Sequence, residues 1–264
     1  MTAASSSKVS LQGIELEVCR KGRGPAMLLL HGGGGPNIGR PFADALAEHF
    51  ELIEPVHPGF AGSRIPEHFD GIEDLVYLYL DLMDALDLKD ATVLGNSMGG
   101  WAAAEIAVRN SQRIARLILV DAIGIKAGGR DERDRADIFA LPAAEVTRLS
   151  WHDPSRAPDA SKLSDAELQI LASNRVALSM YVWDPYMHNP KLPRRLHRIK
   201  VPTLFLWGES DGLITPGYGR AFSAMIPGST LQVIGKAGHS PQVEQPEAFV
   251  QKVLAFAQPT GSKS

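Results

Sequence analysis

The sequence predicts an α/β fold, with a mostly parallel sheet covered by helices on both faces and one inserted helical segment. Short apolar runs alternate with helical stretches along most of the chain, which is the pattern of a parallel sheet. The string from Gly95 to Gly99 reads Gly-x-Ser-x-Gly and lies between one such run and a strong helix-forming segment. The chain has 264 residues, enough for one large domain of this class.

The individual elements follow from apolar periodicity and turn residues. Residues 9–20 alternate apolar and polar side chains and lead into a Gly-Pro cluster, which predicts an edge hairpin. Short apolar runs predict buried strands, and leucines at helical spacing predict a long amphipathic helix. We expect the hairpin at 9–20, strands at 26–30, 51–56, 91–94, 114–120, 201–207 and 230–234, and helices at 41–50, 72–88, 101–107 and 246–256.

The alternation of strands and helices breaks after Ile123. Residues 124–190 are charged, contain several prolines and show helical stretches but no evident strand. The alternation resumes with the apolar run 201–207. We therefore expect a core domain formed by residues 1–123 and 191–264, and a helical cap of residues 124–190 over the carboxyl ends of the strands.

The turn around Ser97 predicts a nucleophile. A sharp strand-to-helix turn holds the serine in a strained backbone conformation and lifts its hydroxyl out of the sheet. A side chain at Gly95 or Gly99 would crowd the neighbouring backbone in such a turn. The following helix directs free N–H groups and its positive end at the place where negative charge would develop.

The composition argues against several other classes of function. The net charge is −3, and no basic surface suggests nucleic acid. The one cysteine, Cys19, cannot form an intramolecular disulfide, and no Cys/His cluster or His-Glu-x-x-His string suggests a metal site. No apolar run approaches ~18 residues, and Met1 to Ser7 lack the apolar core of a signal peptide. We expect a cytoplasmic protein without metal, cofactor, nucleic-acid partner or membrane partner.

Three segments in chain order carry a family resemblance. They are His31-Gly32-Gly33-Gly34, the string from Gly95 to Gly100, and the run from Trp207 to Asp211 followed by Gly238-His239. The chain resembles the α/β-hydrolases over nearly its whole length, which implies an α/β-hydrolase fold with a sheet of about eight strands. Within that superfamily it is similar to the meta-cleavage-product hydrolases, which cut carbon–carbon bonds in ring-fission products.

Two positions depart from the pattern of those carbon–carbon hydrolases. Ser240 follows the histidine of the last segment, where those enzymes usually have Trp. His57 begins a turn that usually begins with Asp in related hydrolases. These departures bear on the substrate and leave the expected fold unchanged.

Ser97, His239 and Asp211 form the expected catalytic triad. A serine hydroxyl needs a base at neutral pH, and His239 lies in a loop just past the last strand. Asp211 follows the strand 201–207 and is expected to accept a hydrogen bond from His239, which fixes the imidazole tautomer. Asp121 also ends a predicted strand and is the rival acid, because some related hydrolases place the acid there.

The family pattern implies an oxyanion hole of two backbone N–H groups. One belongs to Met98, directly after the nucleophile, and the other to Gly33, with Gly32 a close rival. Glycines let the backbone approach a substrate carbonyl closely. The four successive glycines do not indicate a phosphate-binding loop, because the Lys-Ser/Thr of a P-loop and the acidic residue of a dinucleotide site are missing.

Three further residues are candidates for binding substrate. Asn96 is expected either to hydrogen-bond the substrate or to brace the turn around the nucleophile. In the carbon–carbon hydrolases a cap arginine holds the acidic end of the substrate, and Arg175 is the best-placed candidate here; its alternative is a surface charge on a cap helix. Trp183 is expected on the inner face of the cap, with packing inside the cap as its alternative.

The resulting hypothesis is a cofactor-free serine hydrolase that acts on a small molecule. Its first substrate class is a carboxylic ester of small to medium size, cleaved through an acyl-enzyme. The alternative is carbon–carbon cleavage of a meta-cleavage product, a 2-hydroxy-6-oxo-dienoate. A minor alternative is a ligand receptor that keeps the hydrolase fold. Assembly as a homodimer stays open.

Overall fold

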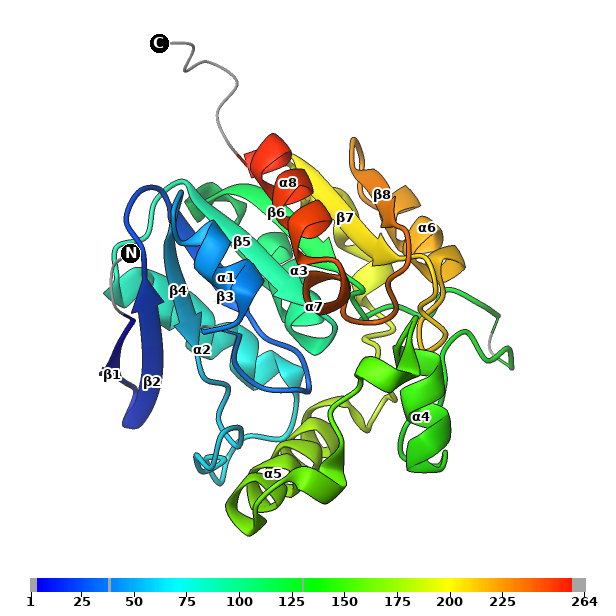
Figure 1. The fold of residues 1–264 in the computed structure, drawn as a ribbon. Helices are drawn as coiled ribbons and strands as arrows, with labels where there is room; N and C mark the ends of the chain where they lie inside the picture. Colours follow the sequence, from blue (N-terminus) through cyan, green and yellow to red (C-terminus); the bar gives the residue numbers. More distant parts are fainter. Residues whose placement is uncertain (1–3, 38, 130, 258–264) are drawn as a thin grey trace.

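An eight-stranded sheet runs through the molecule in the computed structural model, which describes residues 4–37, 39–129 and 131–257. The strand order is β1-β2-β4-β3-β5-β6-β7-β8; β1 and β2 are antiparallel to their neighbours, and the remaining pairs are parallel (Figure 1). The strands are β1 (Ser5–Leu11), β2 (Ile14–Lys21), β3 (Ala26–Leu30), β4 (Glu51–Pro55), β5 (Ala91–Asn96), β6 (Ile114–Val120), β7 (Thr203–Gly208) and β8 (Thr230–Ile234). The prediction of an α/β-hydrolase fold with a mostly parallel sheet is confirmed.

Helices cover both faces of the sheet. The helices are α1 (Pro41–Leu46), α2 (Ile72–Ala85), α3 (Met98–Arg109), α4 (Ala143–Ser150), α5 (Asp165–Val182), α6 (Pro216–Ala224), α7 (Pro241–Glu244) and α8 (Pro246–Ala257). One apolar core joins α2, α3 and α6 to one face, and a second core joins α1 and α8 to the other. Short 3₁₀ turns lie at Ser111–Arg113, Pro154–Arg156, Ala160–Lys162, Leu192–Arg194 and Leu196–Arg198.

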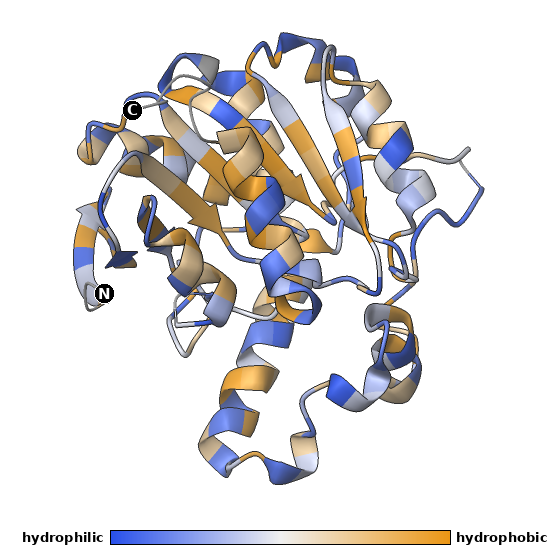
Figure 2. Ribbon diagram, turned by 45° about the horizontal axis from the view of Figure 1, so that its top comes forward, coloured by the Kyte–Doolittle hydropathy of each residue, from blue (hydrophilic) through white to orange (hydrophobic). Residues whose placement is uncertain are grey.

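The central strands are apolar on both sides because both faces of the sheet are covered. All six residues of β7 are buried, and β3 and β5 are each buried at all but one residue. The apolar colouring of the strands against the mixed colouring of the helices shows this layering in Figure 2. Among the described residues, no helix combines the length and apolar character needed to span a bilayer.

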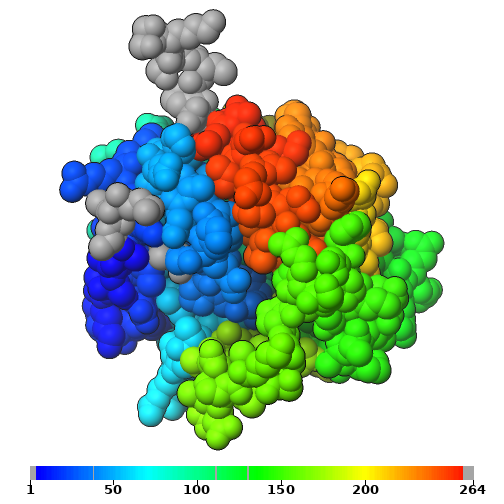
Figure 3. All heavy atoms as spheres, viewed as in Figure 1, coloured from blue at the N-terminus to red at the C-terminus, as the bar shows by residue number. Residues whose placement is uncertain are grey.

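The segment between β6 and β7 forms a separate helical layer at one end of the sheet. Its helices α4 and α5 project from the carboxyl ends of the strands (Figure 1), and in Figure 3 the atoms of this segment, coloured green, gather at the lower part of the molecule. Two contacts join α5 to the loop after β4: Asn174 accepts a hydrogen bond from the Ala61 N–H at 2.9 Å, and the Tyr181 hydroxyl donates to the Pro58 carbonyl at 3.0 Å. The described part of this segment holds one isolated parallel bridge, Gly124 to His188, and no longer strand.

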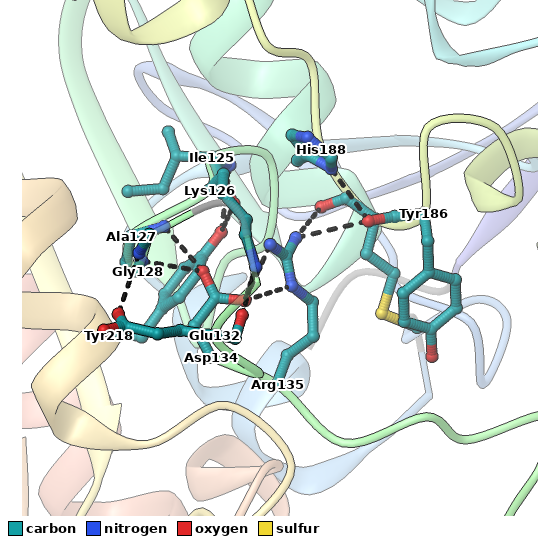
Figure 4. Close-up of polar contacts among 12 residues, drawn as sticks. Ile125, Lys126, Ala127, Gly128, Glu132, Asp134, Arg135, Tyr186, His188 and Tyr218 are labelled. Carbon is teal, nitrogen blue, oxygen red and sulfur yellow. Dashed lines mark hydrogen bonds and ion pairs between the residues drawn. The ribbon is translucent and has the colours of Figure 1, made fainter.

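A buried ion pair lies within this segment, and Tyr218 joins the first part of the segment to the core (Figure 4). Arg135 pairs with Asp134 at 2.7 Å, and its guanidinium also donates to the Met187 carbonyl at 3.0 Å. The Tyr218 hydroxyl, from α6, receives the Ile125 N–H and donates to the Ile125 carbonyl. These contacts hold the backbone that leads from β6 to residues lining the cavity described below. The limits of the cap, 124 and 190, stay a prediction.

Candidate active site

The turn from β5 to α3 has the strained geometry that the sequence predicts. Ser97 lies between the two elements with φ 52° and ψ −116°, a region that non-glycine residues rarely adopt. A Cβ at Gly95 would clash with the Gly99 carbonyl, and a Cβ at Gly99 would clash with the carbonyl oxygens of Leu30 and His31. The glycines therefore permit a turn that exposes the Ser97 side chain at the edge of the sheet.

The structure brings Ser97, His239 and Asp211 into one hydrogen-bonded chain. The Nε2 atom of His239 lies 3.0 Å from the Ser97 Oγ, and its Nδ1 atom lies 2.7 Å from Asp211 Oδ2. The loop after β8 is fixed beside this chain, because the His239 N–H donates to the Ser150 carbonyl at 2.6 Å. With Nδ1 protonated toward Asp211, Nε2 is free to accept the Ser97 proton.

Asp211 is held as an acceptor. Its carboxylate is buried, and its Oδ1 accepts the N–H groups of Leu213 and Ile214 at 2.9 Å each. Two backbone N–H donors and one imidazole N–H thus use both carboxylate oxygens of Asp211 as acceptors. The carboxylate can therefore stabilise a positive charge that develops on His239.

The rival acid, Asp121, does not contact the imidazole. It is fully buried at the end of β6, and its Oδ1 accepts the Gly208 N–H at 2.9 Å. Burial, with the neighbouring Asp211 carboxylate, raises the pKa of Asp121 well above its usual range. A neutral Asp121 avoids the cost of a buried negative charge next to the Asp211 side chain.

The glycine-rich loop after β3 approaches the Ser97 turn closely. A Cβ on Gly32 would lie 2.9 Å from Asn96 Nδ2 and 3.1 Å from the Ser97 Cβ, and a Cβ on Gly33 would lie 2.6 Å from Leu178. Met98 is the first residue of α3, where backbone N–H groups have no partner within the helix. The loop and the helix start thus border the space in front of Ser97, as an oxyanion hole requires.

Two buried histidines with closely spaced rings contact the glycine-rich loop. The His31 and His57 rings lie 3.6 Å apart, and both are fully buried. His57 donates from Nε2 to the His31 carbonyl at 2.7 Å and from its backbone N–H to the His31 Nε2 at 3.0 Å. His31 donates from Nδ1 to the Gly32 carbonyl at 2.9 Å, and the Tyr79 hydroxyl donates to His57 Nδ1. Each ring has one donor and one acceptor partner, which requires the neutral form of both histidines.

These buried histidines predict a loss of stability in acid. Burial lowers the pKa of His31 to about 4, and burial with the neighbouring His31 lowers the pKa of His57 well below its usual range. Below the ordinary histidine pKa the unfolded chain binds protons that the folded chain does not. The contribution of neutral His31 to the free energy of unfolding is therefore complete above about pH 7.5, and by pH 5 that free energy has fallen by roughly 2 kcal/mol.

Urea unfolding at pH 7.5 and pH 5 measures this loss. His31→Gln, which keeps a donor and an acceptor, should flatten the pH dependence of the free energy of unfolding. The exposed His49, changed to Gln, is the matched control and should leave that dependence unchanged. An unaltered dependence in His31→Gln would contradict a neutral buried His31.

A cavity of about 390 Å³ opens in front of Ser97, a volume that suits a small ligand. Of the predicted site residues, Ser97, His239, Gly32, Gly33 and Asn96 line it. Asp211 lies behind His239, and Met98 is buried beneath the turn. Among the described residues, no group of three or more His, Cys, Asp or Glu side chains is placed to hold a metal ion.

Two predicted substrate-binding residues lie outside this cavity. Arg175 is exposed; its guanidinium donates to the Ile138 carbonyl at 2.6 Å and lies 5.2 Å from the Phe139 ring centre. Trp183 is 60% exposed and borders a separate shallow depression. In this structure these side chains belong to the outer surface of α5 and the residues that follow it, which agrees with the alternative of a surface charge for Arg175. A role of either residue in substrate binding stays a prediction.

Sequence reasoning missed most residues that line the cavity. They come from both cap helices, from the loops around them, from the loop after β3 and from α7, and include Arg40, Ile138, Val146, Leu171, Leu178 and Gln242. The cap contributes apolar side chains. Arg40 could have been predicted to line the cavity, because it lies five residues after the glycines, in the same loop.

Comparison with known proteins identifies the family of this chain. The model of the Alpha/beta hydrolase family matches residues 27–252. The chain is 28% identical to a 2-hydroxy-6-oxo-2,4-heptadienoate hydrolase of Pseudomonas putida, covering 92% of this chain and 93% of the relative. It is 28% identical to a 2-hydroxy-6-oxo-6-phenylhexa-2,4-dienoate hydrolase of Burkholderia cepacia, covering 93% and 92%.

Solved structures show the same fold. A meta-cleavage product hydrolase from Pseudomonas fluorescens has a TM-score of 0.77 at 24% identity, covering 95% of this chain and 96% of that one. A membrane phospholipase A has a TM-score of 0.80 at 22% identity, covering 96% and 85%. The matched range includes the Ser97 turn, the glycine-rich loop and the loop that carries His239. The chain belongs to the alpha/beta hydrolase family.

Proposed function

We propose that this protein hydrolyses a carbon–carbon bond in a 2-hydroxy-6-oxo-2,4-dienoate. The observation that carries the proposal is the full-length similarity to relatives named for this reaction, which align with 92% and 93% of the chain. Ester hydrolysis, the first substrate class expected from the sequence, has support only at the level of the α/β-hydrolase family. Carbon–carbon hydrolysis, which the sequence offered as the alternative to ester hydrolysis, is therefore the function we prefer.

In this proposal, Ser97, His239 and Asp211 act as nucleophile, base and orienting acid. The 3.0 Å contact between His239 Nε2 and Ser97 Oγ suits proton transfer during attack on a carbonyl carbon. The N–H groups of Met98 and Gly33 are assigned to the oxyanion. The start of α3 places the positive end of its dipole at the same point.

A dienoate requires a proton shift before the carbon–carbon bond can break. Transfer of the 2-hydroxyl proton to C5, assisted by His239, gives a diketone with a double bond between C3 and C4. Attack of Ser97 at C6 then breaks the C5–C6 bond, and its electrons move into the enone to leave a five-carbon dienolate. Water, activated by His239, releases the acyl group as a carboxylic acid, so one water molecule is consumed for each bond broken.

The cavity and the cap fit this chemistry. Apolar side chains from α4 and α5 close the space in front of Ser97, including Val146, Leu171 and Leu178. Exclusion of water strengthens the hydrogen bonds to a developing oxyanion and protects the dienolate from other reactions. The enclosed volume of about 390 Å³ also limits the substituent that C6 can carry.

A comparison of rates tests the proposal. We expect kcat/KM for 2-hydroxy-6-oxo-2,4-heptadienoate to exceed that for the best p-nitrophenyl ester, from acetate to octanoate, by at least about a hundredfold. The matched control is the same assay with Ser97→Ala. Fast ester turnover without loss of the dienoate would instead identify a carboxylesterase. Absence of turnover of either substrate class would favour the receptor alternative.

A further inference from the structure

The carboxyl end of α4 lies against the two loops that carry Asp211 and His239. The last carbonyl groups of a helix have no partner within that helix. Here the Leu149 carbonyl accepts the N–H of Gly212 at 2.9 Å, one residue after Asp211. The next carbonyl, that of Ser150, accepts the His239 N–H at 2.6 Å. The backbone beside the acid and the backbone of the base are therefore both bonded to the cap.

Glu244 joins the same His239 loop to the residues just after α4. It is the last residue of α7 and is only 3% exposed. Its Oε2 accepts the N–H of Gly238 at 2.6 Å, directly before His239. Its Oε1 accepts the N–H groups of His152 and Asp153 at 3.1 and 3.3 Å. One buried carboxylate thus holds the His239 loop and the cap together.

The surroundings of Glu244 show what its carboxylate is needed for. Its hydrogen bonds to described residues all come from backbone N–H groups. Arg156 lies nearby, yet it donates to the Glu244 backbone carbonyl at 3.0 Å. A buried carboxylate is costly unless several donors converge on it, and a buried N–H is costly without an acceptor. Removal of this side chain would leave the buried Gly238 N–H unpaired, so the loop would have to move.

The Gly238 backbone has little room to move without displacing His239. A Cβ at Gly238 would clash with the Ser150 carbonyl oxygen on the cap side. On the other side, a Cβ at Gly208, the last residue of β7, would clash with the Gly238 carbonyl oxygen. The 3.0 Å contact between His239 Nε2 and Ser97 Oγ depends on this packed backbone. A misplacement of about 1 Å in a reacting group can cost a hundredfold in rate.

We propose that Glu244 is a positioning residue, which holds His239 in place to accept the Ser97 proton by bonding the His239 loop to the cap. This inference rests on the triad assigned in the proposed function and is independent of the dienoate as substrate. Docking of the cap and alignment of the base are then one event. If residues 149–153 leave the core, the His239 loop loses the Ser150 carbonyl and Glu244 loses its cap partners.

The proton between His239 and Asp211 reports this role in the folded full chain without any substrate. The His239 Nδ1–H should give a low-field proton NMR signal in the wild type, assigned by its absence from His239→Gln. In Glu244→Ala we expect this signal to be lost, because a displaced loop lengthens the 2.7 Å contact with Asp211. A residue that only adds stability would lower the melting temperature and leave the signal in place.

The rate at which p-nitrophenyl acetate acylates Ser97 measures the effect on the reaction. We expect a fall of about 100-fold in Glu244→Ala, with the Kd of the ester changed far less. Glu244→Gln keeps the shape of the side chain and one acceptor oxygen, so its rate should fall only about tenfold. The matched control is Glu247→Gln, exposed at the start of α8, which should keep the wild-type rate and signal.

The outcomes separate this inference from the proposed function. Loss of the low-field signal in Glu244→Ala supports it even if the wild type cleaves no dienoate. An unchanged signal in Glu244→Ala, or no such signal in the wild type, would overturn it. If Glu244→Ala does not fold, a wild-type acylation rate in Glu244→Gln would overturn it. If the wild type does not react with the ester, the signal decides alone, in Glu244→Gln where the alanine variant does not fold.

Discussion

Replacing Ser97 by alanine is expected to lower kcat on the order of a million-fold while leaving the folded state intact. The variant removes the Oγ that lies 3.0 Å from His239 Nε2, and no other hydroxyl among the described residues contacts that imidazole nitrogen. Alanine retains a Cβ, so the strain at φ 52° persists, and the thermal midpoint should stay close to that of the wild type. Single-turnover kinetics and differential scanning calorimetry measure the two effects.

A glycine at the same position separates chemistry from strain. Ser97→Gly should be as inactive as the alanine variant, yet at least as stable, because glycine adopts the positive φ without cost from a Cβ. Substantial residual activity in either variant would show that another group attacks the substrate. A large loss of stability in both would show that the turn depends on the serine hydroxyl.

The two buried aspartates should respond very differently to the same substitution. Asp211→Asn places an amide against His239 Nδ1 and disfavours the tautomer that leaves Nε2 as the base, so kcat should fall about 10⁴-fold. Asp121→Asn should stay within about tenfold of the wild type, because an amide can replace a neutral carboxyl beside the Asp211 carboxylate. In both variants the asparagine side-chain oxygen can still accept the backbone N–H group that the aspartate accepts, from Gly208 at position 121 and from Leu213 at position 211.

The pH profile of kcat/KM distinguishes the two roles. In Asp121→Asn the acidic limb, which reports protonation of the base, should keep its position. A severe loss of activity in Asp121→Asn with a nearly normal Asp211→Asn would mean that the acid lies at the end of β6. The 2.7 Å contact between His239 and Asp211 argues for the opposite outcome.

The parts of the site that the sequence predicts are those set by local backbone geometry. The turn at Ser97 needs glycine on both sides, a strand before it and a helix after it, and all of these can be read directly from the chain. His239 and Asp211 follow strands that end at the same edge of the sheet, so their nearness to Ser97 follows from the topology. Whether these residues perform catalysis stays a prediction.

The cap could not be placed from the sequence in the same way. The apolar residues of α5 are divided between the cavity, the core loop and the outer surface, because this helix contacts the core along only part of its length. Arg175 and Leu178 are three residues apart, yet only Leu178 reaches the cavity. Spacing along the helix gave no means of choosing between these faces, so the sequence left two alternatives open for each of Arg175 and Trp183.

Helix ends and the role of His57 also depended on tertiary contacts. The helix predicted at 41–50 ends at Leu46, and the helix predicted at 72–88 ends at Ala85, because the residues that follow turn back before the next strand. His57 departs from the family pattern, yet its backbone N–H and its Nε2 both donate to His31, and its Nδ1 accepts from the Tyr79 hydroxyl. Only the three-dimensional arrangement shows that this departure supports the glycine-rich loop.

Identification of the products formed in ¹⁸O-labelled water tests the proposed carbon–carbon hydrolysis most directly. With 2-hydroxy-6-oxo-2,4-heptadienoate and wild-type protein, mass spectrometry should detect acetate carrying the label and an unlabelled five-carbon 2-hydroxydienoate in equal amounts. Ser97→Ala should form neither product. Persistence of the dienoate with active wild-type protein, or its loss without labelled acetate, would contradict carbon–carbon hydrolysis at this site.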